Sequence, residues 1–147
     1  MECESCQECQ RLGEFKTVKD WDVDSGEAAL LMRALSRIAD RRANADGSPS
    51  VIERIACGAA VLRVFYTECG PRALYVLGFT EGAATIIAAY SECGEAAVHI
   101  GLREAAHVAK WMGFSSLSFY SRRKGWRQKA GLFGFTRVGE FTYTQEV

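Results

Sequence analysis

A basic segment near the end of the chain holds the residues best suited to bind an anion. Five cations fall within eight positions: Arg122, Arg123, Lys124, Arg127 and Lys129. Trp126 stands among them, and its ring can stack on a base or on another flat ring. Such cations can hold the phosphates of one small cofactor or of a nucleic acid. The alternative is a solvated basic turn in which Trp126 packs the following helix against the core, and the sequence leaves both open.

Charge is distributed unevenly along the 147 residues. Basic and acidic residues number 18 each, so the net charge is zero and no general attraction to nucleic acid or membrane is expected. Residues 103–137 contain eight basic residues and one acid, a local charge of +7, whereas residues 1–70 contain nine basic and twelve acidic residues. The C-terminal part therefore carries a local positive field that can hold an anion.

Tyr120, Ser121 and Tyr90 are the candidates for proton transfer. Each stands at the end of a segment whose composition predicts a strand, and α/β sheets usually bind ligands at strand ends. A hydroxyl there can donate a proton to a leaving group. The alternative for each tyrosine is a half-buried strand aromatic with a satisfied hydroxyl. Glu68 and Glu81, at predicted turns, are candidates for a general base or else solvated turn residues.

The N-terminal ten residues contain Cys3, Cys6 and Cys9 at three-residue spacing. Three thiolates can bind zinc or an iron–sulfur cluster, but a tetrahedral site needs a fourth ligand, which the sequence does not identify. Because no second cysteine pair follows, a polar terminus with three thiols is favoured and no metal site is predicted. These residues resemble no signal peptide and no apolar run is long enough to cross a bilayer, so we expect reduced thiols and a cytoplasmic location.

Periodicity and turn residues predict the elements that position these side chains. We expect a strand in 13–21, a helix from a capping box at Asp24 and Glu27 to near Arg42, and a short helix from an N-cap at Ser48-Pro49 to about Cys57. Three strands follow at 59–68, 72–79 and 85–90, and their short turns favour an antiparallel meander. A long helix opens at 91–94 and stops at Gly113, a strand covers 115–120, a short segment starts at Gly125, and a last strand covers 136–144.

The predicted fold class is therefore α/β with a mixed sheet, in which the meander precedes one parallel βαβ crossover and a C-terminal strand. The crossover joins 85–90 to 115–120 through the long helix and should be right-handed. We expect one domain over 13–147, preceded by a polar, cysteine-containing segment over 1–12.

This order of elements, with the segment from Trp111 to Phe135, resembles the GCN5-related N-acetyltransferase (GNAT) superfamily. The nearest likeness is to small acetyltransferase-like proteins of bacteriophages, which often show Trp and Gly at the end of the long helix, an Arg-Lys-Gly-Trp-like turn after the next strand, and a closing Gly-Phe. The matching residues here are Trp111, Gly113, Arg123-Lys124-Gly125-Trp126 and Gly134-Phe135. The Mom-type DNA-modifying proteins are more distant members of the same fold.

The resemblance implies that acyl-CoA lies between the strands at 85–90 and 115–120, with its pyrophosphate on the start of the helix that joins them. Ser91, Cys93, Gly94 and Glu95 are then predicted to bind the cofactor, with Arg122, Arg123 and Trp126 beside them.

The sequence departs from the superfamily pattern at two places. The helix start lacks the usual basic or Gln residue and the paired glycines, and its Glu92 and Glu95 should repel a pyrophosphate. The superfamily's frequent general acid, a Tyr shortly before the closing Gly-Phe, is also absent. That role would pass to Tyr120, Ser121 or Tyr90.

The resemblance implies an acyl-CoA-dependent N-acyltransferase that positions a neutral amine against a thioester, and its nearest likeness implies that the protein is phage-encoded. The alternative is a GNAT-fold scaffold without acyl-CoA chemistry, used as a binding or virion component, or a nucleic-acid-modifying relative. The expected partners are a small acyl donor or a protein, with nucleic acid as a further candidate for the basic segment and no membrane.

Overall fold

The computed structural model describes residues 13–37 and 50–147. Their strands form one sheet in the order β1-β2-β3-β4-β5-β7-β6. The strands are β1 (Glu14–Thr17), β2 (Ala60–Thr67), β3 (Gly70–Thr80), β4 (Ala83–Ser91), β5 (Ser116–Tyr120), β6 (Thr136–Arg137) and β7 (Thr142–Glu146). The helices are α2 (Gly26–Arg37), α4 (Val51–Ala56), α5 (Glu95–Trp111) and α6 (Trp126–Lys129), followed by the 3₁₀ helix η1 (Ala130–Phe133).

The predicted α/β fold class is confirmed. β1 to β4 pair with their neighbours in antiparallel fashion, as a meander should. β4 then pairs in parallel with β5 across the α5 crossover, and β5 pairs antiparallel with β7. The segment over 1–12, including its three cysteines, lies outside the described residues.

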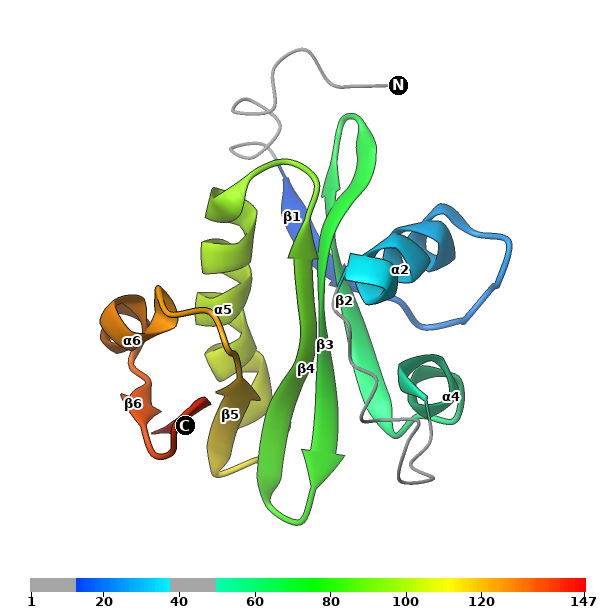
Figure 1. The fold of residues 1–147 in the computed structure, drawn as a ribbon. Helices are drawn as coiled ribbons and strands as arrows, with labels where there is room; N and C mark the ends of the chain where they lie inside the picture. The colour runs from blue at the N-terminus through cyan, green and yellow to red at the C-terminus, as the bar shows by residue number, and fades with distance from the viewer. Residues whose placement is uncertain (1–12, 38–49) are drawn as a thin grey trace.

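Helices cover the two faces of the sheet, which we call the α5 face and the α2 face. α5 and α6 lie on one side, and α2 and α4 lie on the other (Figure 1). The α5-face core is built around Tyr75 and Leu117, whereas the α2-face core is built around Leu62 and Val76. Alternate residues of β3 enter opposite cores, as the twofold period of a strand requires. None of the helices in the described ranges is long and apolar enough to cross a membrane.

Gly101 lets α5 approach the sheet closely. A Cβ at this position would lie 3.1 Å from Phe15 Cζ and 3.2 Å from Tyr75 Cδ1. A glycine inside a helix costs about 1 kcal/mol relative to alanine. The contact that it permits with two aromatic rings of the core explains why a glycine fits here.

Two predicted helix caps are wrong by one or two residues. The N-cap of α2 is Ser25, whose Oγ accepts a hydrogen bond from Ala28 N (3.1 Å), and not Asp24. The N-cap of α4 is Ser50, whose Oγ accepts from Glu53 N (3.1 Å), and not Ser48. In each case a neighbouring oxygen-bearing side chain satisfies the free amides of the first turn, so residue type alone could not choose between them.

The predicted strands at the two ends of the chain are longer than the observed ones. β1 covers only 14–17 of the predicted 13–21. The last strand is a hairpin of β6 and β7, because Arg137 Nε donates to Gly139 O (3.0 Å) and to Glu140 O (3.2 Å) and so folds the connecting turn. The predicted alternation of Phe141 to Thr144 lies within its second strand and the residue before it.

Candidate functional site

β4 and β5 pair along only part of β4. The parallel ladder joins residues 83–86 to residues 116–119 and ends at the pair Ile86–Phe119. Residues 87–91 continue past β5, and residues 88–91 pair with β3 alone (Figure 1). These five residues span about 16 Å and leave their β5-facing amide and carbonyl groups outside the ladder. We call this stretch the β4 edge.

A β-bulge at Ile87 marks the beginning of the β4 edge. Val76 pairs with Ala88 and Leu77 with Ile86, so no β3 residue pairs with Ile87. Ile87 and Ala88 consequently both contact the α2-face core, although they are consecutive residues. Because a bulge bends its strand and increases the local twist, it accounts for the separation of β4 from β5 at this point.

α5 begins directly beyond the β4 edge. Its N-cap is Gly94, which has a φ of 107° and provides no side-chain cap. A helix of 17 residues presents free amides and the positive end of its dipole here. Ser91 shapes the preceding turn, since its Oγ accepts from the buried Cys93 N (3.1 Å). The predicted cofactor residues Ser91, Cys93, Gly94 and Glu95 therefore all lie at one helix N-terminus.

The two acids at this turn are both paired with cations. Arg33 of α2 donates two hydrogen bonds to the Glu92 carboxylate, each of 2.8 Å, and the Tyr90 hydroxyl donates a third (2.9 Å). The hydrogen bond from Arg33, with a smaller effect from Tyr90, lowers the pKa of Glu92 although partial burial opposes this. Lys129 Nζ lies 3.7 Å from Glu95 Oε2. The expected repulsion of an anion is therefore weakened by neighbouring positive charge.

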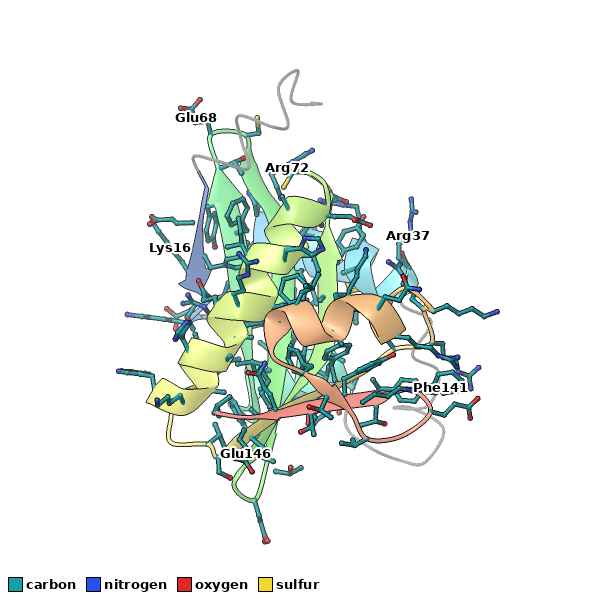
Figure 2. The ribbon with its side chains drawn as sticks, turned by 90° about the vertical axis from the view of Figure 1, so that its left-hand side faces the viewer. Lys16, Arg37, Glu68, Arg72, Phe141 and Glu146 are labelled. Atoms are coloured by element: carbon teal, nitrogen blue, oxygen red, sulfur yellow. The ribbon has the colours of Figure 1, made fainter. Side chains whose placement is uncertain are left out.

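Arg72 supplies another cation to the same turn from the start of β3. Its Nη2 donates to Glu92 O (3.0 Å), and its buried Nε has no hydrogen-bond partner. Figure 2 shows Arg72 beside the first turn of α5. Sequence reasoning missed Arg33 and Arg72 because they lie 59 and 20 residues from Glu92 along the chain. The cations absent from the local motif thus come from other elements.

The two candidate tyrosines occupy different positions along the β4 edge. Tyr90 lies four residues, or about 13 Å, beyond the last β4 residue that pairs with β5. Its hydroxyl donates to Glu92, and burial with this hydrogen bond raises the pKa of Tyr90. Tyr120 is one residue beyond Phe119 and is 49% exposed. Its oxygen accepts from Arg122 Nε (3.1 Å). Tyr120 is therefore the candidate at the point where the two strands separate.

The turn after β5 carries Ser121, Arg122 and Arg123. Ser121 Oγ accepts from Arg123 N (3.2 Å), and Ser121 N donates to Phe141 O (2.9 Å), so Ser121 holds the turn together. Arg122 lies over the Phe141 ring, 5.5 Å from its centroid. Both arginines are exposed. The turn leads into α6, whose Lys129 reaches the first turn of α5.

Trp126 packs α6 against the α5-face core. Its ring meets Phe119 edge-on with centroids 5.2 Å apart, and lies 6.3 Å from Phe133. Of the two interpretations open from the sequence, this geometry favours the packing role. Residues 130–133, which replace the superfamily's usual tyrosine region, form η1.

Neither candidate base lies at the point of separation. Glu81 is exposed in the turn before β4, five residues from Ile86 and at the other end of the paired ladder. Glu68 is exposed in the β2–β3 turn, beyond Ser91, because Ala73 already pairs with Ser91. Both are solvated turn residues in this fold. Within 13–37 and 50–147, no three His, Cys, Asp or Glu residues gather where they could hold a metal ion.

Comparison with known proteins finds a likeness in structure only. No family model and no curated protein sequence matches the chain. An IAA acetyltransferase from Bacillus cereus superposes with a TM-score of 0.65 at 16% identity, covering 92% of this chain and 99% of that one. A Bacillus subtilis acetyltransferase solved with CoA gives a TM-score of 0.63 at 10% identity over the same shares.

A third structure, a Desulfovibrio desulfuricans protein assigned to the GNAT family as an acetyltransferase, gives a TM-score of 0.62 at 14% identity. It covers 91% of this chain and 98% of that one. These likenesses extend over nearly the whole length of each neighbour and include the mixed sheet with its parallel crossover. The chain therefore has the fold of the GNAT acetyltransferases.

Proposed function

We propose that the protein is an acyl-CoA-dependent N-acyltransferase whose donor lies along the β4 edge. The observation that carries the proposal is that two features of the fold lie next to each other. A strand edge without its β5 partner leads directly to a helix N-terminus without a side-chain cap. The edge suits the amide groups of a pantetheine arm, and the helix start suits its pyrophosphate.

The residues around this path fit an acyl-CoA in charge as well as in shape. Residues 87–91 would bind the arm through the backbone, and the first amides of α5 would bind the phosphates. Arg72 and Lys129 add positive charge near those amides, while Arg33 compensates Glu92. When bound, acyl-CoA supplies a thioester, which is the acyl donor. The Bacillus subtilis neighbour solved with CoA agrees with this chemistry.

Tyr120 is the proposed proton donor. In acyl transfer the amine nitrogen attacks the thioester carbon, the C–N bond forms, the C–S bond breaks, and the sulfur leaves as a thiolate that needs a proton. The amine loses one proton to solvent. A donor must lie near the start of the β4 edge, where Tyr120 is and Tyr90 is not. The contact with Arg122 orients the Tyr120 ring.

Arg122 and Arg123 are proposed to bind the phosphates of this one cofactor. The packing of Trp126 against Phe119 leaves its ring only partly exposed, which disfavours its use as a stacking surface for single-stranded nucleic acid. A salt series separates the two partners. Nucleic acid binding through several phosphates should weaken steeply with salt, and cofactor binding should weaken less.

The second candidate is a GNAT-fold scaffold without acyl-CoA chemistry, used as a binding or virion component. The observation in its favour is that η1 carries no tyrosine. A bacteriophage origin and a cytoplasmic location also remain predictions.

Calorimetric titration with acetyl-CoA tests the proposal, and Ala96→Asp makes the test specific. Ala96 is exposed in the first turn of α5, where an added carboxylate should stabilise the helix yet repel a pyrophosphate. We expect the wild type to bind, and the variant to bind about tenfold more weakly without loss of thermal stability, which corresponds to about 1.4 kcal/mol.

Ala29→Asp is the matched control, because Ala29 is exposed near the start of α2 and should leave the affinity unchanged. A wild-type protein that shows no binding at millimolar acetyl-CoA would overturn the enzyme proposal in favour of the scaffold.

A further inference from the structure

A row of small hydroxyl side chains crosses β4, β5 and β7 on the α2 face. Thr85 pairs with Ser118, and Ser118 pairs with Thr144. Their strand neighbours belong to the α5-face core, so these three side chains point to the opposite side. The α2-face core includes no residue of β5 or β7. We call Thr85, Ser118 and Thr144 the polar floor.

The polar floor adjoins the start of the β4 edge. Thr85 is one residue before the last paired residue, Ile86, and Ser118 is one residue before Phe119. Ser118 Oγ donates to Thr144 Oγ1 (2.8 Å), which donates to Leu117 O (3.3 Å). The opposite face is filled at this level by Phe119, Trp126 and the rest of the α5-face core. An acceptor molecule can therefore approach the β4 edge from the α2 face.

Arg54 of α4 lies at the β3 border of this floor. Gly78, which pairs with Thr85, leaves space on the α2 face. A Cβ on Gly78 would lie only 3.1 Å from Arg54 Nη2 and 3.3 Å from Ile87 Cγ2. The guanidinium thus occupies the space above a glycine, next to the bulge residue and one strand away from the polar floor.

The Arg54 guanidinium has no hydrogen bond or ion pair with any described residue, although the side chain is partly buried. The other partly buried arginines in the described ranges have partners: Arg63 bonds to Glu104 and Arg72 to Glu92. A guanidinium offers a planar fork of donors that matches one carboxylate in bidentate fashion. Partial desolvation without a partner among the described residues suits a cation that receives its anion from a ligand.

We propose that the acceptor is a small amine that bears a carboxylate, such as an α-amino acid, with its carboxylate on Arg54. This inference rests on the proposed function, because it assumes a thioester near Ile87. Adjacent strands lie about 4.8 Å apart, so a group on Arg54 above β3 is one to two strand spacings from the end of the β4–β5 ladder. A small amino acid spans that distance, with its amine over the polar floor.

The test is a panel of acceptors assayed for CoA release with acetyl-CoA as donor. It comprises the α-amino acids and their carboxamides. Ethanolamine and phosphoethanolamine form a further pair, which tests whether a phosphate is preferred in place of a carboxylate. We expect at least one amino acid to react with a kcat/KM tenfold or more above that of its carboxamide. Arg54→Gln should remove this preference by lowering the value for the acid alone, and Arg54→Lys should retain part of it.

Lys110→Gln is the control for loss of one positive charge, since Lys110 is exposed at the far end of α5. Acetyl-CoA affinity and thermal stability are measured on every variant. Four outcomes would overturn the inference while acetyl-CoA still binds. They are equal rates for acids and carboxamides, an equal loss of both in Arg54→Gln, a preference for phosphoethanolamine, and no reaction of any amino acid. A wild-type protein that does not bind acetyl-CoA would instead overturn the proposed function and this inference with it.

Discussion

Two clusters in this molecule contain the same three residue types in different surroundings. In the first, Arg63 and the Tyr75 hydroxyl both donate to Glu104 Oε1, at 2.6 Å each. In the second, Arg33 and the Tyr90 hydroxyl both donate to the Glu92 carboxylate. Each cluster joins a helix to the sheet or to the turn that follows it. We call them the Glu104 cluster and the Glu92 cluster.

The clusters differ in exposure and in what surrounds them. The side chains of Arg63 and Glu104 are 18% and 26% exposed, and Tyr75 is buried. Arg33 is 51% exposed, and Glu92 adjoins the start of α5. The same three residue types therefore have two different roles. One cluster holds α5 on β2 and β3, and the other sets the charge beside a candidate anion site.

Removal of the central carboxylate should give the largest difference between the two clusters, measured as the free energy of unfolding. Glu104→Ala leaves a partly buried Arg63 and the Tyr75 hydroxyl without their acceptor, so we expect a loss of about 3 kcal/mol in the free energy of unfolding. Glu92→Ala should cost less than about 1 kcal/mol, because Arg33 is half exposed.

Urea denaturation measures both changes, and an unchanged m-value would assign them to the native state. Glu81→Ala, at an exposed turn, is the control for removal of a carboxylate. Similar losses for Glu104→Ala and Glu92→Ala would contradict the distinction between a structural and a functional cluster.

The tyrosine that belongs to the Glu92 cluster should matter less for catalysis than Tyr120. Tyr120→Phe should lower kcat about 100-fold with the best acceptor of the panel above, as loss of a general acid does. Tyr90→Phe should change kcat less than about threefold, because a single hydrogen bond near the phosphate end is lost far from the reacting atoms. Steady-state kinetics on both variants decides the matter, and the reverse order would reassign the proton donor to Tyr90.

High pH should weaken the fold through the Glu104 cluster. Burial, followed by the hydrogen bond to Glu104, raises the pKa of Tyr75 far above its ordinary value of 10.0. A raised folded-state pKa stabilises the native state fully below pH 10, and this contribution is lost as pH rises from there. We expect the free energy of unfolding to fall by about 1.4 kcal/mol per pH unit for this group above pH 10.

Tyr66, whose pKa burial and Glu27 raise to about 12, adds a similar slope over a shorter range. Tyr75→Phe should therefore be less stable than the wild type at pH 8 yet show a shallower decline above pH 10. Denaturant midpoints at a series of pH values measure the slope. Parallel curves for the variant and the wild type would show that Tyr75 does not carry the alkaline loss.

The fold could be predicted from the sequence because its signals are local. The meander follows from short turns between apolar segments, and the crossover follows from a helical stripe that ends at Gly113. The predicted helix caps are wrong because several neighbouring side-chain oxygens near each helix start can accept a hydrogen bond from the same first-turn amide. The hairpin of β6 and β7 was missed because its turn is fixed by Arg137 bonds to backbone carbonyls, which residue type does not reveal.

The candidate site could be predicted only in part, because its charges come from distant elements. The positions of Ser91 to Glu95 at a helix start follow from the order of elements. Arg33 could not be predicted as part of the site, since nothing in the sequence of α2 indicates that it reaches Glu92. Arg54 gave no signal at all, because its environment depends on a glycine in another strand.

The smallest expected effect concerns how the Glu92 cluster tunes acetyl-CoA affinity. Arg33→Gln leaves the Glu92 charge uncompensated beside the first turn of α5, so the dissociation constant should rise about fivefold, or about 1 kcal/mol. Glu92→Gln removes that charge and keeps Arg33, so affinity should stay the same or improve.

The double variant should return close to the wild type, because the two charges act on the ligand in opposite directions. The differences should shrink at 1 M salt, where the screening length falls to about 3 Å. Calorimetry on the four proteins at two salt concentrations measures the full cycle. An equal loss of affinity in Arg33→Gln and Glu92→Gln would mean that the cluster acts by holding the turn in shape, since a loss of position does not depend on which partner is removed.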